Sequence, residues 1–212
     1  MEYNNGNYNK YMSKNILKRK MLSKFTDKII SFIKKAVSEC EQRSAGKNEK
    51  LRILDAGCGE GFLSGYMHDE LGNQVDITGL EYTSEALKIA KERNKDINFI
   101  QGDIMDMPFE DNSFDIVVCT EVLEHLHDPA KALSQLLRVS KGVLIISVPN
   151  EPWFCLGNLL ALKNVTRLGN PIDHINHWTY SKFASFLKKN SNKKWYMDKS
   201  FPWTIARCRA FR

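Results

Sequence analysis

The chain has 212 residues, of which 42% are hydrophobic and 26% are charged, and its formal net charge is +6. It is long enough to bury a real core, and no apolar run approaches the roughly 18 residues that a membrane-spanning helix needs. Its five cysteines include no C-x-x-C pair, which argues against a disulfide framework or a cysteine zinc site. The polar start lacks the apolar core of a secretory signal, so we expect a cytoplasmic protein.

The positive charge is concentrated at the start of the chain. Residues 1–50 contain twelve Lys or Arg against five Asp or Glu, whereas the remainder is almost neutral. From Met12 to Arg43, apolar residues recur at helical spacing with lysines opposite them, which predicts an amphipathic helix packed at the mouth of the main domain. Its basic face is interpreted as solvated, with contact to an anionic substrate, nucleic acid or membrane surface left open. We predict a helical lid or extension over residues 1–48 and a main domain over 49–212.

The main domain alternates between strand and helix patterns. Strands are predicted at 51–55, 75–81, 97–100, 114–119 and 143–148. Helices are predicted at 60–71, from Thr83 or Ser84 to 94, from Asp128-Pro129 to 140, and from Thr179 to 189. This alternation predicts an α/β, doubly wound, mostly parallel sheet. Residues 150–178 lack a pattern and are expected to form a long functional loop. Strands at 194–200 and 203–210 would then close the sheet as an antiparallel hairpin.

A glycine turn follows the first predicted strand. That strand ends at Asp55, and Gly57, Gly59 and Gly61 form a G-x-G-x-G pattern. A dinucleotide fingerprint would need glycine where Phe62 stands. An acid at this strand end suits a ligand with a cationic amino group, so S-adenosylmethionine (SAM) is favoured over a dinucleotide, with an NAD-linked oxidoreductase as a distant alternative.

Acidic residues also end the next two strands. Glu81 is placed to accept hydrogen bonds from both ribose hydroxyls of a nucleoside. Asp103 would bond an adenine amino group while Ile104 packs on the ring. Because the carboxyl ends of parallel strands meet at one edge of the sheet, these acids are expected to share one site.

Several motifs together are similar to those of a known family. Asp55–Gly61, Gly102–Ile104 and Phe114–Val117 with Glu121–His125 resemble the class I SAM-dependent methyltransferases of the type 11 group, over about residues 49–212. The resemblance implies a Rossmann-like, seven-stranded sheet with an antiparallel C-terminal hairpin. It also implies that the cofactor, SAM or its product S-adenosylhomocysteine, is bound by a set of residues at the strand ends. That set is Asp55, Gly57, Gly59, Glu81, Tyr82, Asp103, Ile104, Thr120 and Glu121.

The segment after the fourth strand offers catalytic groups. For an oxygen acceptor, His125 would act as general base with Glu124 orienting it. Alternatively, the segment only shapes its loop. The combination of Glu121, Glu124, His125 and His174 is similar to that of small-RNA 3′-end 2′-O-methyltransferases and, for E-x-x-E-H, of ubiquinone-pathway O-methyltransferases. That similarity implies Mg²⁺ or a similar divalent ion beside the acceptor hydroxyl.

The predicted function is SAM-dependent methylation of oxygen on a small molecule. Aromatic residues in the predicted loop and just after it would offer an aromatic or lipid-like acceptor a stacking surface: Trp153, Phe154, Trp178 and Tyr180. The alternatives are an RNA 3′-end 2′-O-methyltransferase, which the basic start favours, and a non-catalytic protein that binds SAM or S-adenosylhomocysteine. The sequence does not distinguish oxygen from nitrogen or carbon as the methylated atom, and it gives no oligomeric state.

Overall fold

The computed structural model describes residues 14–43, 49–160 and 164–210. Seven strands form one mixed sheet in the order β3-β2-β1-β4-β5-β7-β6. β1 to β5 are parallel, and β7 runs antiparallel between β5 and β6. The strands are β1 Leu51–Ala56, β2 Val75–Glu81, β3 Asn98–Gln101, β4 Phe114–Thr120, β5 Ser140–Pro149, β6 Trp195–Ser200 and β7 Trp203–Arg209. The predicted α/β sheet with its closing hairpin is therefore confirmed.

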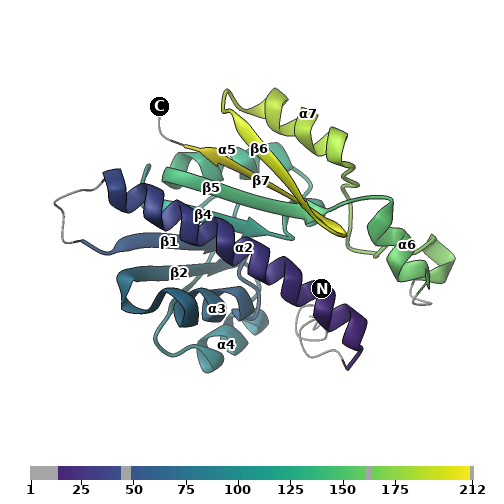
Figure 1. Ribbon diagram of the computed structural model, residues 1–212, viewed down its shortest axis with the longest axis horizontal. Helices are drawn as coiled ribbons and strands as arrows, with labels where there is room; N and C mark the ends of the chain where they lie inside the picture. Colours follow the sequence, from purple (N-terminus) through teal and green to yellow (C-terminus); the bar gives the residue numbers. More distant parts are fainter. Residues whose placement is uncertain (1–13, 44–48, 161–163, 211–212) are drawn as a thin grey trace.

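Helices cover both faces of this sheet (Figure 1). The helices are α2 Ile16–Arg43, α3 Phe62–Leu71, α4 Ser84–Arg93, α5 Pro129–Val139, α6 Trp153–Leu160 and α7 Tyr180–Asn190, with 3₁₀ turns η1 Gly72–Gln74, η2 Leu123–His125 and η3 Val165–Arg167. One core cluster joins α2, α3 and α4 to one face, and a second joins α5 and α7 to the other. The continuous apolar run in β4 follows from this arrangement, since Ile116 and Val117 point to opposite faces and are both fully buried.

The α2 helix packs along a sheet face instead of lying only at the mouth. Ile29, Ile33 and Ala36 on its apolar stripe are fully buried in the core cluster of that face. The ring of Phe25 lies 4.5 Å from that of Trp203 at the start of β7. The first half of α2 lies toward the carboxyl ends of the parallel strands, where α6 also projects (Figure 1). A division into an extension and a main domain at residue 48 stays a prediction.

Local signals explain where two of the helices begin. The Asp128 side chain accepts a hydrogen bond from the Lys131 amide at 3.0 Å, and Pro129 follows it at the first helical position. Thr179 accepts likewise from the Lys182 amide at 3.1 Å. Thr83 precedes α4 as predicted, but its hydroxyl donates to Glu81 and does not cap the helix.

The connection between α5 and β5 differs from the prediction. The helix ends at Val139 and the strand begins at Ser140, so Lys141-Gly142 belongs to the strand and does not separate the two elements. Packing is the reason: a Cβ atom on Gly142 would lie 2.2 Å from the Asp115 carbonyl oxygen. The glycine is needed here for close approach of backbones and not for a turn.

Residues 150–178 are not a loop throughout. They contain α6 and η3, and the ends of the segment meet where the Glu151 amide donates to the Trp178 carbonyl at 2.7 Å. Because α6 is apolar at nearly every position, its sequence shows no helical period. Within the described residues, no helix is long and apolar enough to cross a membrane.

The burial of α2 predicts a difference between two isoleucines of the same helix. Ile33→Ala should lower the free energy of unfolding by about 2–5 kcal/mol, because it leaves a cavity in the core. Ile16→Ala, at a position that is 81% exposed, is the matched control and should change it by less than about 0.5 kcal/mol. Urea unfolding measures both values. Equal, small effects would show that α2 is a detachable lid.

Candidate functional site

The glycine turn after β1 is tied to the end of β2. The amides of Gly57 and Cys58 both donate to the Leu80 carbonyl oxygen, at 2.8 and 3.0 Å. The φ angles of the three glycines are +79°, +54° and +72°, in the left-handed region. A Cβ on Gly57 would also lie 2.4 Å from Val122 Cγ2. The predicted turn is thus confirmed, and it places bare backbone against the segment that follows β4.

Glu81 lies against this turn. One carboxylate oxygen accepts from the Gly59 amide at 2.9 Å, and the other accepts from the Thr83 amide at 2.9 Å and the Thr83 hydroxyl at 2.7 Å. The side chain therefore joins the turn to the start of α4. Its predicted place at the end of the second strand is confirmed, and its bond to ribose stays a prediction.

Asp55 is enclosed by protein. Its side chain is 1% exposed and accepts a hydrogen bond from the Ser64 hydroxyl at 2.6 Å, which fastens β1 to α3. Burial raises the pKa of Asp55 to about 6; the Ser64 bond opposes this rise, and the nearby Glu81 carboxylate adds to it. Little of its surface is open to a ligand, so the structure assigns Asp55 a role in fixing the turn. Direct contact with the cofactor stays a prediction.

The predicted adenine contacts lie on the segment after β3. The Asp103 carboxylate accepts from the Met105 amide at 2.8 Å, and Ile104 is buried. Tyr82, which lies nearby at the end of β2, is 70% exposed. The Gly102 amide donates to the Glu81 carbonyl at 3.0 Å, which keeps this segment beside the ribose-binding candidate.

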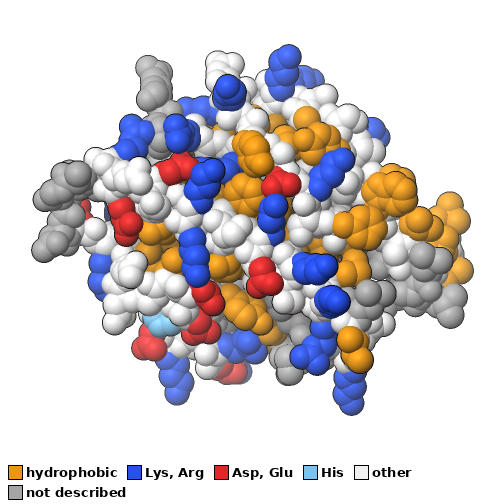
Figure 2. Space-filling model, in the orientation of Figure 1, with side chains coloured by type: hydrophobic (Ala, Val, Ile, Leu, Met, Phe, Trp, Pro, Cys, Tyr) orange, Lys and Arg blue, Asp and Glu red, His pale blue; other side chains and the backbone are white. Residues whose placement is uncertain are grey.

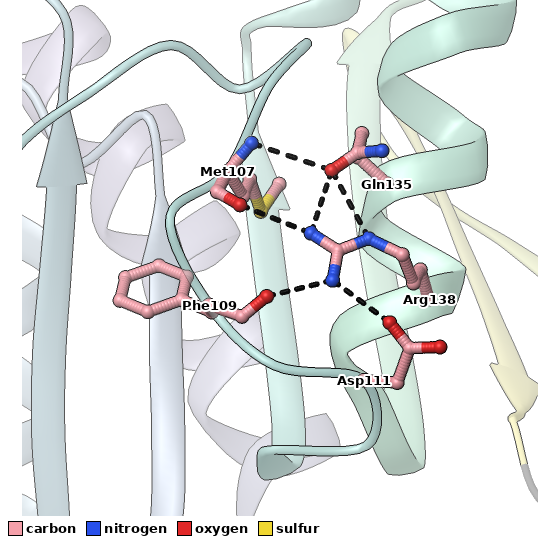
Figure 3. Close-up of polar contacts among 5 residues, drawn as sticks. All are labelled: Met107, Phe109, Asp111, Gln135 and Arg138. Carbon is pink, nitrogen blue, oxygen red and sulfur yellow. Dashed lines mark hydrogen bonds and ion pairs between the residues drawn. The ribbon is translucent and has the colours of Figure 1, made fainter.

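Arg138 fixes the rest of that segment (Figure 3). From α5, its guanidinium donates to the carbonyls of Phe109 and Met107 at 2.6 and 3.0 Å, and to the Asp111 carboxylate at 2.9 Å. It also bonds Gln135 one turn earlier in the helix, at 2.7 Å. Sequence reasoning missed this clamp because the only local signal is an Arg and a Gln three positions apart on one helix.

A second group of polar side chains lies after β4. Glu124, His125 and His174 each offer one ligand atom, and these atoms lie within 4.8 Å of one another. The backbone makes this possible, because the Glu124 carbonyl accepts from the amides of Ile175 and Asn176, both at 2.9 Å. The predicted approach of His174 to the E-x-x-E-H segment is therefore confirmed. We call these three residues the acid–histidine cluster.

The histidine rings of this cluster are held in defined orientations. His125 Nδ1 lies 2.9 Å from the Asp173 carbonyl oxygen, an arrangement that requires a proton on Nδ1 and leaves Nε2 to face Glu124 at 4.0 Å. The His174 ring stacks on Phe154 of α6 with centroids 5.4 Å apart. One carboxylate and two imidazoles are a suitable donor set for a divalent metal ion.

Glu121 lies outside the cluster. It has a φ of +59°, and its carboxylate accepts from the Trp203 indole nitrogen at 2.5 Å. Thr120 ends β4 beside it and is half-buried. Contact of Thr120 or Glu121 with the cofactor, and Glu121 as a metal ligand, stay predictions.

The predicted aromatic stacking surface is only partly correct. Trp153 is exposed and Phe154 reaches the cluster, but Trp178 is buried and packs on Phe183 and Phe186 of α7, with centroids 5.6 and 4.9 Å apart. Trp178 is therefore core on the opposite side of the sheet. Aromatic content alone does not show which rings of an irregular segment face inward.

Comparison with known families agrees with this geometry. The family model described as a methyltransferase domain matches residues 47–197. The chain belongs to this family. Its sheet and helices have the fold of the class I SAM-dependent methyltransferases, as the sequence resemblance implied.

Individual relatives cover the domain to different extents. A demethylmenaquinone methyltransferase of Renibacterium salmoninarum is 38% identical over 105 residues, which are 49% of this chain and 43% of that protein. The matched part is thus less than half of this curated relative. The SAH-bound crystal structure of magnesium protoporphyrin IX methyltransferase from Synechocystis superposes with a TM-score of 0.64 at 16% identity, over 95% of this chain and 91% of that chain. The crystal structure of the methyltransferase domain of bacterial CtHen1-CN superposes with a TM-score of 0.66 at 18% sequence identity. The superposition covers 89% of this chain and 99% of that chain.

The raised pKa of Asp55 predicts a pH-dependent cost of folding. In the unfolded chain the carboxyl loses its proton near pH 3.9, but in the folded protein it does so only near pH 6. The folded state binds more protons between these values, so stability falls as pH rises from about 4 to 6 and is then constant for this group. Relative to Asp55→Asn, the wild-type free energy of unfolding should fall by on the order of 2 kcal/mol over that range. Urea unfolding at several pH values measures it, and parallel curves would contradict the prediction.

Proposed function

We propose that this domain binds SAM at the glycine turn and transfers its methyl group to an oxygen atom of a small-molecule acceptor. The observation that supports this most is the contact between the two candidate sites. Val122, which precedes the acid–histidine cluster, fits against the bare Gly57 backbone at the turn. A donor held at the turn would therefore lie next to groups that can take a proton from the acceptor.

The chemistry needs few groups. The sulfonium of SAM is already an activated methyl donor, so alignment of donor and acceptor provides much of the rate enhancement. Transfer to a hydroxyl forms the new C–O bond as the methyl–sulfur bond breaks, and the hydroxyl proton must leave. His125, whose Nε2 faces the cluster, is placed to accept that proton, with the nearby Glu124 carboxylate stabilising the imidazolium.

A divalent ion is a second way to activate the hydroxyl. Glu124, His125 and His174 would hold it, and their ligand atoms are close enough to do so. Such an ion would lower the pKa of an acceptor hydroxyl, so that its proton could pass to solvent water without a dedicated base. Glu124 is 1% exposed, and a cation bound beside it would stabilise the charge of its carboxylate.

The name of the Renibacterium relative supports a small-molecule acceptor for this domain, since it specifies demethylmenaquinone. An RNA 3′-end acceptor is the second candidate, because the acid–histidine cluster gathers as the sequence similarity to 2′-O-methyltransferases implied. The near-neutral charge of residues 51–212 gives it less support. A non-catalytic protein that binds SAM or S-adenosylhomocysteine would keep the turn and need no such cluster.

The cofactor assignment is tested by calorimetry with S-adenosylhomocysteine. Glu81→Gln removes a charged acceptor and should weaken binding by roughly 10- to 150-fold, the equivalent of about 1.5–3 kcal/mol. Glu85→Gln, at an exposed position on α4, is the matched control and should bind as the wild type does. A screen with labelled SAM over quinols, sugars and RNA then identifies the acceptor. Absence of micromolar binding by the wild type would refute the proposal.

The metal proposal predicts binding that does not depend on activity. Metal-free protein titrated with Mn²⁺ should bind about one ion, with loss of the calorimetric signal in Glu124→Gln and His174→Ala. His127→Ala is the control, because His127 is exposed and lies outside the cluster. If the wild type binds no Mn²⁺ and methyl transfer survives a chelator, the metal role is wrong. His125 would then act as the general base.

A further inference from the structure

Exposed apolar side chains gather at one end of the molecule. Among the described residues, every highly exposed Ile, Leu, Val, Phe and Trp lies either at the start of α2 or between residues 153 and 201. The other large exposed hydrophobics are tyrosines: Tyr66, Tyr82 and Tyr196. We call the second group the apolar tip: Trp153, Leu156, Val165, Leu168, Ile172, Ile175 and Phe201. Leu168 and Ile172 are each more than 75% exposed, which is costly for a surface that meets only water.

The tip is built by elements distant in sequence. The ring of Trp153 in α6 lies 6.3 Å from that of Phe201, which forms the turn of the β6–β7 hairpin. η3 and the residues after it add the aliphatic side chains. The α6 end of this tip stands out as a group of orange side chains beside the sheet domain (Figure 2).

Basic side chains lie next to this apolar surface. Lys14, Lys18, Arg19, Lys20 and Lys24 precede the first acid of α2, which is Asp27. The start of α2 projects from the same end of the molecule as α6, and several blue side chains lie around it (Figures 1 and 2). Between Trp153 and Ile172 the sequence contains no acidic residue, and Arg167 in η3 is exposed. One acid, Asp173, lies between the tip residues Ile172 and Ile175, and its carboxylate is 3.4 Å from His125 Nδ1. The basic residues of α2 and Arg167 flank the rest of the apolar tip.

We propose that the apolar tip and the basic first half of α2 together form a docking surface for a membrane that contains anionic lipids. Aliphatic and aromatic side chains enter the interfacial region while lysines and arginines contact the headgroups, which is how peripheral proteins bind without a spanning segment. A second copy of the chain fits less well. A two-fold interface centred on the tip would bring two basic α2 segments toward each other.

Docking in this way would orient the proposed active site. Phe154, next to Trp153, stacks on His174, and the Ile175 amide bonds the carbonyl of Glu124. The apolar tip therefore continues directly into the acid–histidine cluster. If the proposed function holds, on which this step rests, the acceptor is an amphiphile whose hydroxyl lies at the membrane surface.

Vesicle sedimentation with the full chain tests the docking surface. The wild type should bind vesicles of phosphatidylcholine with 30% phosphatidylglycerol and should bind pure phosphatidylcholine vesicles at least ten-fold less. Leu168→Asp with Ile172→Asp should abolish binding, whereas Tyr66→Asp with Tyr196→Asp, exposed but remote from the tip, should not.

The basic half of the surface is tested in the same assay. Arg19→Glu with Lys20→Glu should weaken vesicle binding roughly 30-fold or more, since each basic residue near an anionic surface contributes about a five-fold factor. Lys88→Glu with Lys91→Glu on α4 is its control.

Other outcomes would overturn the proposal. Absence of vesicle binding by the wild type would contradict it. So would an equal loss of vesicle binding in the tip variant (Leu168→Asp with Ile172→Asp) and the tyrosine variant (Tyr66→Asp with Tyr196→Asp). A dimer in analytical ultracentrifugation that Leu168→Asp with Ile172→Asp dissociates, without vesicle binding, would assign the tip to a second copy. The affinity for S-adenosylhomocysteine in the absence of vesicles is measured in parallel. It should be unchanged in the tip variants, so failure of docking and failure of cofactor binding are separate results.

Discussion

The close approach of backbone at the end of β1 is the constraint on which the rest of the site depends. Two successive amides of the glycine turn donate hydrogen bonds to the Leu80 carbonyl, and the Gly59 amide donates a third to the Glu81 carboxylate. These bonds fix the carboxyl ends of β1 and β2 relative to each other. Val122 then fits where a side chain at residue 57 would have been, which sets the position of the segment after β4. One turn thus determines both where a donor would bind and where the proton-accepting groups stand.

Asp55 shows that this site is not optimised for stability alone. A buried carboxylate with one hydrogen bond and a second acid nearby costs free energy when it is charged, which is why its pKa rises to about 6. A cationic ligand at the turn would favour the charged form and offset that cost. Local costs of this kind are expected at binding sites, because the ligand supplies the missing partner.

Most of the sheet and part of the site could be predicted from sequence. The strands were predictable because their apolar runs and the glycine turn are local sequence signals. The proximity of His174 to Glu124 and His125 was predicted from the family resemblance. Tertiary contacts could not be predicted. Trp178 is an exception that was overlooked, because it precedes the Thr179 cap and its contact with Phe183 is a hydrophobic staple. Nothing near Ser64 or Arg138 indicates which groups they bond. The α6 helix was missed because nearly all its residues are apolar, so its sequence has no amphipathic periodicity. A surface helix of this composition itself suggests a contact with something other than water.

The α2 helix connects the core to that surface. Its buried stripe explains why apolar residues recur along it, and burial of Ile29 and Ile33 anchors it to the sheet. The core does not explain the basic residues in its first part, because Arg19, Lys20 and Lys24 are exposed and the helix contains no acid before Asp27. Like charges close together on a helix repel and weaken the helix slightly, so this concentration of positive charge favours an external anionic partner. Their position beside the apolar tip makes a lipid surface the partner that satisfies both features at once.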